Sequence, residues 1–196
     1  FNTFYAEADH LLSLNKDWKL RLGAQFTDQR AVGDANLPPA QGKYWVTHTG
    51  GTRLQLIYRE LTLTAAFSIT GDGNNIQTPW GTFPGYLSMI DQDFNRANEK
   101  AVLVGAAYDF SKVLTEGLSA YMKFAWGTDA INPTTRRDAP NQAEYDFNVD
   151  YRPPWIDPTP LRGIWFRARA AVLDQQNAKT TGYQFRLILN WERDLI

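Results

Sequence analysis

The sequence has 196 residues and no cysteine, so neither a disulfide framework nor a thiolate metal site is available to it. It also lacks any uninterrupted apolar run of the roughly 18 residues that a transmembrane helix needs, and its mean hydropathy is -0.43. A basic surplus is missing as well, because 20 basic residues face 21 acidic ones. A nucleic-acid-binding protein would carry such a surplus, so we expect no nucleic-acid partner.

Aromatic residues, by contrast, make up 14% of the chain, and they take part in an alternating pattern. The stretch IWFRARAAV, residues 164–172, places Ile164 and Phe166 on one side of an extended chain and Arg167 and Arg169 on the other. The same alternation recurs in residues 18–27, 53–58, 61–70, 118–126, 143–151 and 183–192. Two more stretches, around 2–12 and 101–110, follow it less cleanly, and their register stays open near residues 1–14 and 99–110. The pattern predicts an all-β chain of about nine strands.

The connections between these strands alternate in length. The turn at Arg59-Glu60 is short, whereas the stretches 28–51, 71–98 and 127–142 are long and rich in Gly, Pro, Asn and Asp. Short turns at one end and long loops at the other are typical of a transmembrane antiparallel β-barrel, which a hydropathy window does not detect. Loops of this length would be unusual inside a compact soluble domain.

Large aromatic residues stand near the strand ends, where a membrane barrel carries its aromatic girdles. They are Trp18, Tyr58, Tyr108, Trp126, Tyr151 and Trp191. A soluble antiparallel β-domain with a binding role remains an alternative, because its strands alternate too. The ionisable groups on the polar face of strand after strand favour the barrel, in which these groups point into a water-filled lumen.

The inward arginines and lysines would attract carboxylates, since a guanidinium group offers fork-shaped donors to them. Inward acids on the same strands, such as Asp146 and Asp150, are expected to form salt bridges with neighbouring Arg and Lys. His10 and His48 are isolated and lack metal-ligand spacing, so we expect no metal site, and we take both for loop or interface residues. No acid is set against a base in an apolar pocket, so neither catalytic residues nor a cofactor are predicted.

Several segments resemble the OprD-type family of substrate-specific outer-membrane porins. PGYLSMIDQDFNRANEKAVLVGAAYDFS, residues 84–111, resembles the family's stretch from a loop folded into the pore to the following strand. AEYDFNVDYRPPW, LRGIWFRARAAVLD and YQFRLILNWE resemble its last three strands. The resemblance implies an eighteen-stranded barrel, and an odd number of antiparallel strands cannot close by itself. We therefore expect residues 1–196 to be the C-terminal part of a single barrel domain.

The resemblance also implies roles for individual residues. In the family, a ladder of basic side chains on the inner wall faces polar groups of inward-folded loops. Arg167, Arg169 and Arg186 match ladder positions, and Lys19, Arg21, Arg53 and Lys123 have the right inward parity by pattern alone. Ser88, Asp91, Asp93 and Arg96 fall in the stretch that resembles the constricting loop.

The expected function follows from these features. The chain is predicted to belong to a porin, and not to an enzyme, in the outer membrane of a Gram-negative bacterium. Its solutes would be small anionic or zwitterionic carboxylates, such as amino acids and aromatic or organic acids, passing by weakly saturable diffusion. The further partners would be outer-membrane lipid and lipopolysaccharide. One alternative function stays open, a general diffusion pore with little selectivity. The oligomeric state also stays open between a monomer and a trimer.

Overall fold

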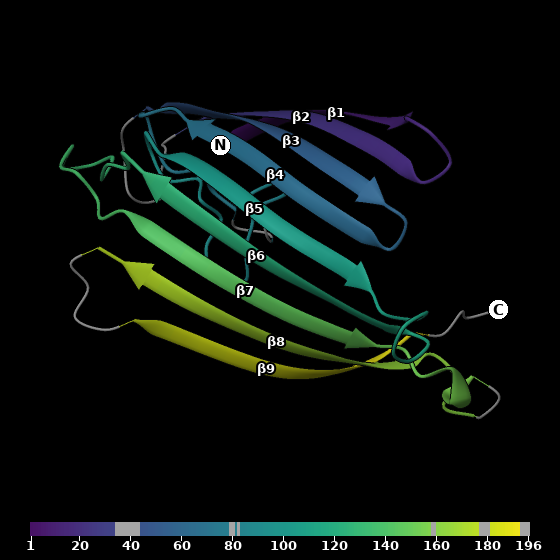
Figure 1. Cartoon of the computed structure of the whole chain (residues 1–196). Coiled ribbons are helices and arrows are strands. Elements are labelled where there is room, and N and C mark those ends of the chain that lie inside the picture. The colour runs from purple at the N-terminus through teal and green to yellow at the C-terminus, as the bar shows by residue number, and fades with distance from the viewer. Residues whose placement is uncertain (34–43, 79–80, 82, 158–159, 177–180, 193–196) are drawn as a thin grey trace.

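The computed structural model describes residues 1–33, 44–78, 81, 83–157, 160–176 and 181–192, and nine strands lie within them. Each strand pairs antiparallel with the next one along the chain, so the strands form one sheet in the order β1 to β9 (Figure 1). The strands are β1 (Asn2–Ser13), β2 (Trp18–Arg30), β3 (Val46–Tyr58), β4 (Leu61–Thr70), β5 (Lys100–Asp109), β6 (Leu118–Thr128), β7 (Gln142–Tyr151), β8 (Ile164–Gln175) and β9 (Gly182–Trp191). The predicted all-β architecture of nine antiparallel strands is confirmed.

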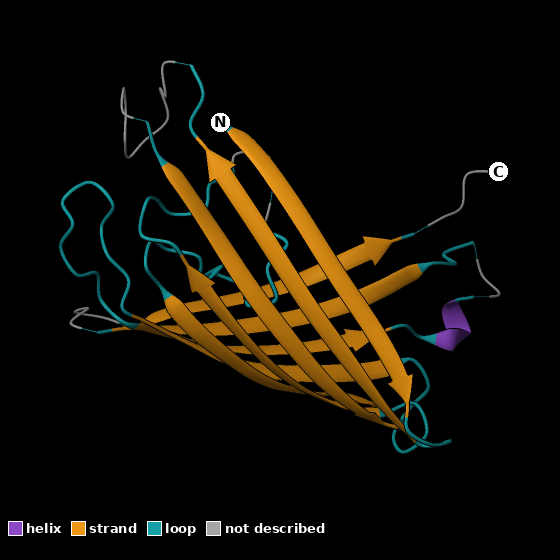
Figure 2. Cartoon of the chain, turned by 90° about the horizontal axis from the view of Figure 1, so that it is seen from above, coloured by secondary structure: helices purple, strands orange, loops and turns teal. Residues whose placement is uncertain are grey.

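The sheet is strongly curved, and its two faces differ in what they contact. Figure 2 shows the strands bent into a trough, with loop segments lying inside its hollow. We call the hollow side the inner face and the opposite side the outer face. Successive residues of each strand alternate between the two faces, and the ladder register keeps this alternation in step from β1 to β9.

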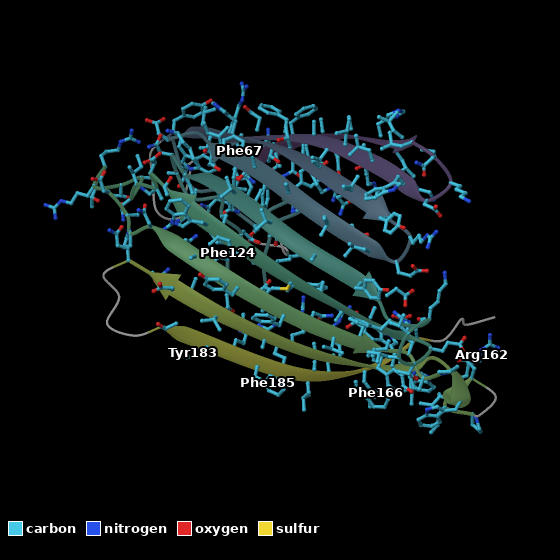
Figure 3. All side chains as sticks on the ribbon, in the orientation of Figure 1. Phe67, Phe124, Arg162, Phe166, Tyr183 and Phe185 are labelled. Carbon is cyan, nitrogen blue, oxygen red and sulfur yellow. The ribbon has the colours of Figure 1, made fainter. Side chains whose placement is uncertain are left out.

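The outer face carries large apolar side chains that are exposed on the surface of the chain. Met122 is 55% exposed and Leu187 is 74% exposed. In Figure 3, Phe67, Phe124, Phe166 and Phe185 belong to this face on four different strands. A water-soluble sheet would bury such residues, whereas lipid accommodates them.

The inner face shows the opposite distribution, because many of its buried side chains are polar. Those with less than a tenth of their surface exposed include Gln25, Thr27, Gln29, Thr47, Thr49, Ser68, Thr70, Gln142, Glu144, Asp146 and Asn148. Because the exposed apolar side chains lie on the other face, the fold is apolar outside and polar inside, as a membrane barrel requires.

The outward aromatic residues cluster where the strands approach the short turns. The rings of Trp18 and Tyr58 lie on neighbouring strands with their centroids 4.4 Å apart. Tyr108 contacts Phe110 at 4.7 Å, at the next short turn. These rings form the girdle at one end of the strands, as the sequence predicts.

Two strands extend further than the alternation predicts. Strand β2 continues to Arg30 and β3 already begins at Val46, although residues 28–51 were expected to be loop. The pattern ends early because polar residues such as Asp28 stand at outward positions there and Gly50-Gly51 interrupts it. His10 and His48 lie within β1 and β3, so the loop alternative is wrong for both, and the interface alternative stays a prediction. Residues 34–43, which belong to the same predicted loop, lie outside the described residues.

The helical content of the described residues is one turn of 3-10 helix, Pro154–Ile156, between β7 and β8. No helix in that part of the chain has the length and apolarity to cross a membrane.

Candidate functional site

The described part of the loop between β4 and β5, residues 71–78, 81 and 83–99, lies against the inner face of the sheet. Leu87 and Phe94 of this loop are almost fully buried, with 1% and 2% of their surface exposed. They form one apolar cluster with inward residues of the wall, namely Ala66, Ala101, Leu103 and Ala125. The loop is thus attached to the lumen wall by a small hydrophobic core of its own.

A second attachment joins the loop to strand β7 through main-chain groups. The N–H of Ile90 donates to Asp146 Oδ2 at 3.0 Å. The N–H groups of Asp91 and Gln92 donate to the two carboxylate oxygens of Glu144, each at 2.8 Å. Three consecutive N–H groups therefore bind two carboxylates that are fully buried in the wall.

A third attachment fixes the loop to the opposite side of the sheet. The hydroxyl of Tyr86 donates to Glu7 Oε1 on β1 at 2.8 Å, and the guanidinium of Arg53 lies 4.2 Å from the centre of the Tyr86 ring. Gly23 on β2 makes room for this ring, because an added Cβ would lie 2.6 Å from the Tyr86 hydroxyl. Burial and the hydrogen bond to the Glu7 carboxylate raise the pKa of Tyr86 to about 12.

The residues predicted for the constricting loop do not share one environment. Ser88 Oγ donates to Asp93 Oδ1 at 2.6 Å, and Asp91 Oδ1 accepts a hydrogen bond from Gln184 Nε2 on β9 at 2.7 Å. Arg96 instead binds the buried carboxylate of Glu99 at 2.5 Å. Asp91 thus lies beside β7 and β9, Ser88 and Asp93 bind each other within the loop, and Arg96 fastens the end of the loop.

Three of the seven predicted ladder residues form salt bridges with acids of the wall. Arg21 and Arg53 both bind Asp9 on β1, at 2.6 and 2.8 Å. Arg167 makes two bonds of 2.6 Å to the two oxygens of Asp150.

The other four ladder residues point inward and form no salt bridge within the described residues. They are Lys19, Lys123, Arg169 and Arg186. Arg169 and Arg186 are direct cross-strand partners on β8 and β9. Two like charges in such a position repel each other, so a free anion between them would be stabilised. The polar neighbour of Arg169 is the Tyr121 hydroxyl, at 3.5 Å.

The inward acids Asp146 and Asp150 bind different kinds of partner, which the sequence did not indicate. Asp150 pairs with Arg167, as expected. The same expectation is wrong for Asp146, which accepts from the main chain of the loop and has no salt bridge among the described residues. The one signal in the sequence is the run of inward acids and amides on a single strand, namely Gln142, Glu144, Asp146, Asn148 and Asp150.

A hollow of about 240 Å³ lies on the inner face, near the short turns. Its polar lining includes Thr62, Asp109, Ser119, Tyr121, Asn148 and Asp150. No group of three His, Asp or Glu side chains able to hold a metal ion occurs in the described part of the chain. Most of the residues that line this hollow are polar, and the carboxylates of Asp109 and Asp150 are among them.

The comparison with protein families gives a match along nearly the whole chain. Residues 1–195 match the model of the outer membrane porin, OprD family. Among curated proteins, no sequence match is found. The family resemblance of residues 84–111 and of the last three strands is thus confirmed, as is the expectation that the protein is not an enzyme.

Solved structures of channels from Pseudomonas aeruginosa share this fold. OpdK, solved with vanillate, superposes with a TM-score of 0.81 at 20% identity, over 95% of this chain and 47% of its own. OprD gives a TM-score of 0.82 at 17% identity, over 95% of this chain and 50% of its own. OccK9 (OpdG) gives 0.80 at 22% identity, over 95% and 46%. This chain spans about half the length of these relatives, and it belongs to the OprD family of porins, which reside in the outer membrane.

Proposed function

We propose that this chain forms the C-terminal part of a barrel that conducts small carboxylate-bearing solutes passively across the outer membrane. The observation that carries the proposal is the Arg169–Arg186 pair. These two inward guanidinium groups oppose each other on neighbouring strands without a carboxylate partner among the described residues. A solute carboxylate would bind between them and relieve their repulsion.

The arrangement of the other cations supports passage rather than tight binding. Lys123 stands on β6 with its ammonium group 4.9 Å from the Tyr121 ring, and Lys19 stands on β2, so a carboxylate meets single charges at several places on the wall. Sites that are weak and multiple let a solute leave as well as enter. The β4–β5 loop narrows the lumen beside these residues, which favours contact between solute and wall.

The relatives are compatible with a carboxylate solute. OpdK was solved with vanillate, so a barrel of this fold accommodates a small aromatic acid. Zwitterionic solutes also fit the proposal, because the Asp91 carboxylate binds Gln184, which stands two residues from Arg186 on the inner face of β9.

Planar-bilayer recordings of the full-length porin test this function. In a salt gradient we expect Arg169→Ala and Arg186→Ala to shift the reversal potential towards lower anion preference. We also expect them to weaken the saturable block that a small carboxylate such as benzoate exerts. Arg59→Ala is the matched control, because Arg59 lies in a short turn and pairs with Asp17 outside the lumen. Unchanged reversal potentials in both lumen variants would favour the general diffusion pore.

A further inference from the structure

The middle of the β4–β5 loop binds the wall through an unusual set of contacts. Residues 90–92 donate three consecutive main-chain N–H groups, and the acceptors are the carboxylates of Glu144 and Asp146 on β7. We propose that Glu144 and Asp146 are positioning residues of the pore-narrowing loop, and that protonation of Glu144 releases the main chain of Asp91 and Gln92 and changes the aperture. The inference rests on the proposed function to the extent that the loop lines a conducting lumen.

The two carboxylates differ in how they use their oxygens. Both carboxylate oxygens of Glu144 accept hydrogen bonds from the loop, one from the N–H group of Asp91 and one from that of Gln92. Once protonated, one of these oxygens carries a hydrogen and is a much weaker acceptor, so its bond to the loop N–H group is weakened. Asp146 accepts through Oδ2 only, and its buried Oδ1 has no hydrogen-bond partner in the described part of the chain. A proton on Oδ1 would leave the bond to Ile90 intact, so the sensitive member of the pair is Glu144.

The charged groups that face the pair come from three elements. On β7 the two carboxyls face each other within hydrogen-bonding reach. Lys123 on β6 is the register partner of Asp146, and Arg169 on β8 acts on Asp146 electrostatically. From the loop, the main chain of Asp91 binds Glu144, and the Asp91 carboxylate accepts from the neutral Gln184 on β9. No cation forms a salt bridge with Glu144 among the described residues, so the partners of its two oxygens are the loop N–H groups.

Release of this contact would not detach the whole loop. Leu87 and Phe94 remain packed on the wall, and Tyr86 keeps its bond to Glu7. The segment free to move is the one between these attachments, with the Asp91 carboxylate on it. Losing one hydrogen bond to a charged acceptor raises the ratio of released to docked segment by about 10- to 100-fold.

Single-channel recordings of the full-length porin across a range of pH provide the test. We expect acidification of the wild type to change the conductance and to increase current fluctuation. Glu144→Gln places an amide donor where an acceptor is needed, so it should show the acid behaviour at every pH. Asp150→Asn is the matched control, since it removes the same charge from the same face of β7 without a loop contact, and it should keep the wild-type response.

Three results would overturn the proposal. One is a wild-type conductance that does not respond to acid, and another is a Glu144→Gln channel with the wild-type response. The third comes from cross-linking and does not depend on how Glu144→Gln folds. Asp91 and Gln184 are in contact, and the chain has no cysteine, so Asp91→Cys with Gln184→Cys allows a short reducible cross-link. The cross-link should abolish the acid response and reduction should restore it, whereas a response that survives the cross-link contradicts the proposal.

Failure here is distinguishable from failure of the proposed function. Anion preference at neutral pH depends on Arg169 and Arg186, and it would persist with a loop that does not respond to acid. An acid response could equally be present in a pore without anion preference.

Discussion

Replacing Phe94 with alanine should remove the largest apolar contact between the β4–β5 loop and the lumen wall. The side chain is 2% exposed and lies over Gly127, where an added Cβ would come within 2.9 Å of the ring. An aromatic side chain buries about 150–250 Å², which at about 25 cal/mol/Å² corresponds to about 4–6 kcal/mol. Truncations of buried Phe to Ala cost about 3–5 kcal/mol. We therefore expect the equilibrium ratio of undocked to docked loop to increase by more than about 100-fold.

Limited proteolysis of the folded full-length porin measures this shift. Chymotrypsin should cleave the loop after Tyr86, at a rate that follows the population of undocked loop. The barrel itself should stay folded, which the heat-dependent shift of its electrophoretic mobility reports. Phe147→Ala is the matched control, because Phe147 lies on the outer face and is 48% exposed. If Phe94→Ala were cleaved at the wild-type rate, docking of the loop would not depend on this apolar cluster.

Three further changes test other parts of the structure. Because burial raises the pKa of Tyr86 to about 12, its bond to Glu7 should be intact below the ordinary value of about 10 and be lost as the pH rises through the higher one. The ultraviolet absorption of tyrosinate should accordingly lose a late-titrating component in Tyr86→Phe, and an unchanged titration would contradict this. Gly23→Ala should displace the Tyr86 hydroxyl and lower its pKa towards the ordinary value, which the same titration follows. Met122→Arg should destabilise the barrel by about 2–4 kcal/mol in urea unfolding from lipid vesicles, with Met122→Leu as the control; equal stability would mean that Met122 does not face lipid.

The sequence predicts which way the strand residues face because a membrane barrel leaves little choice. On β8 an arginine directed at lipid would cost about 2–4 kcal/mol, so Arg167 and Arg169 must point inward once Ile164 and Phe166 point outward. The ladder register agrees with this assignment on both neighbours, β7 and β9. Strand length and alternation are local properties of the chain, so the sequence also predicts that the short turns lie together at one end of the strands.

The contacts between loop and wall could not be predicted, because they join residues that are distant in sequence. Glu144 follows Asp91 by 53 positions, and no periodicity links a main-chain N–H group to its acceptor. An inward acid beside Lys123 looks like a salt-bridge partner, which is why the expectation for Asp146 is wrong. The division of the basic ladder into paired and unpaired members has the same origin, since Asp9 selects Arg21 and Arg53 through geometry alone.

Strand β5 illustrates what the docked loop contributes to the specification of the barrel. Its run AVLVGAA, residues 101–107, is apolar on both faces, because one face meets lipid and the other meets Leu87 and Phe94. The alternation pattern therefore does not specify which face of β5 points to the membrane. A shift of the pairing register by one residue would exchange the two faces. The inward residues Ala101 and Leu103 belong to the apolar cluster that holds the loop, whereas Val102 and Val104 lie on the outer face. Loop docking thus favours the observed facing of β5, because a strand turned the other way would lose this packing.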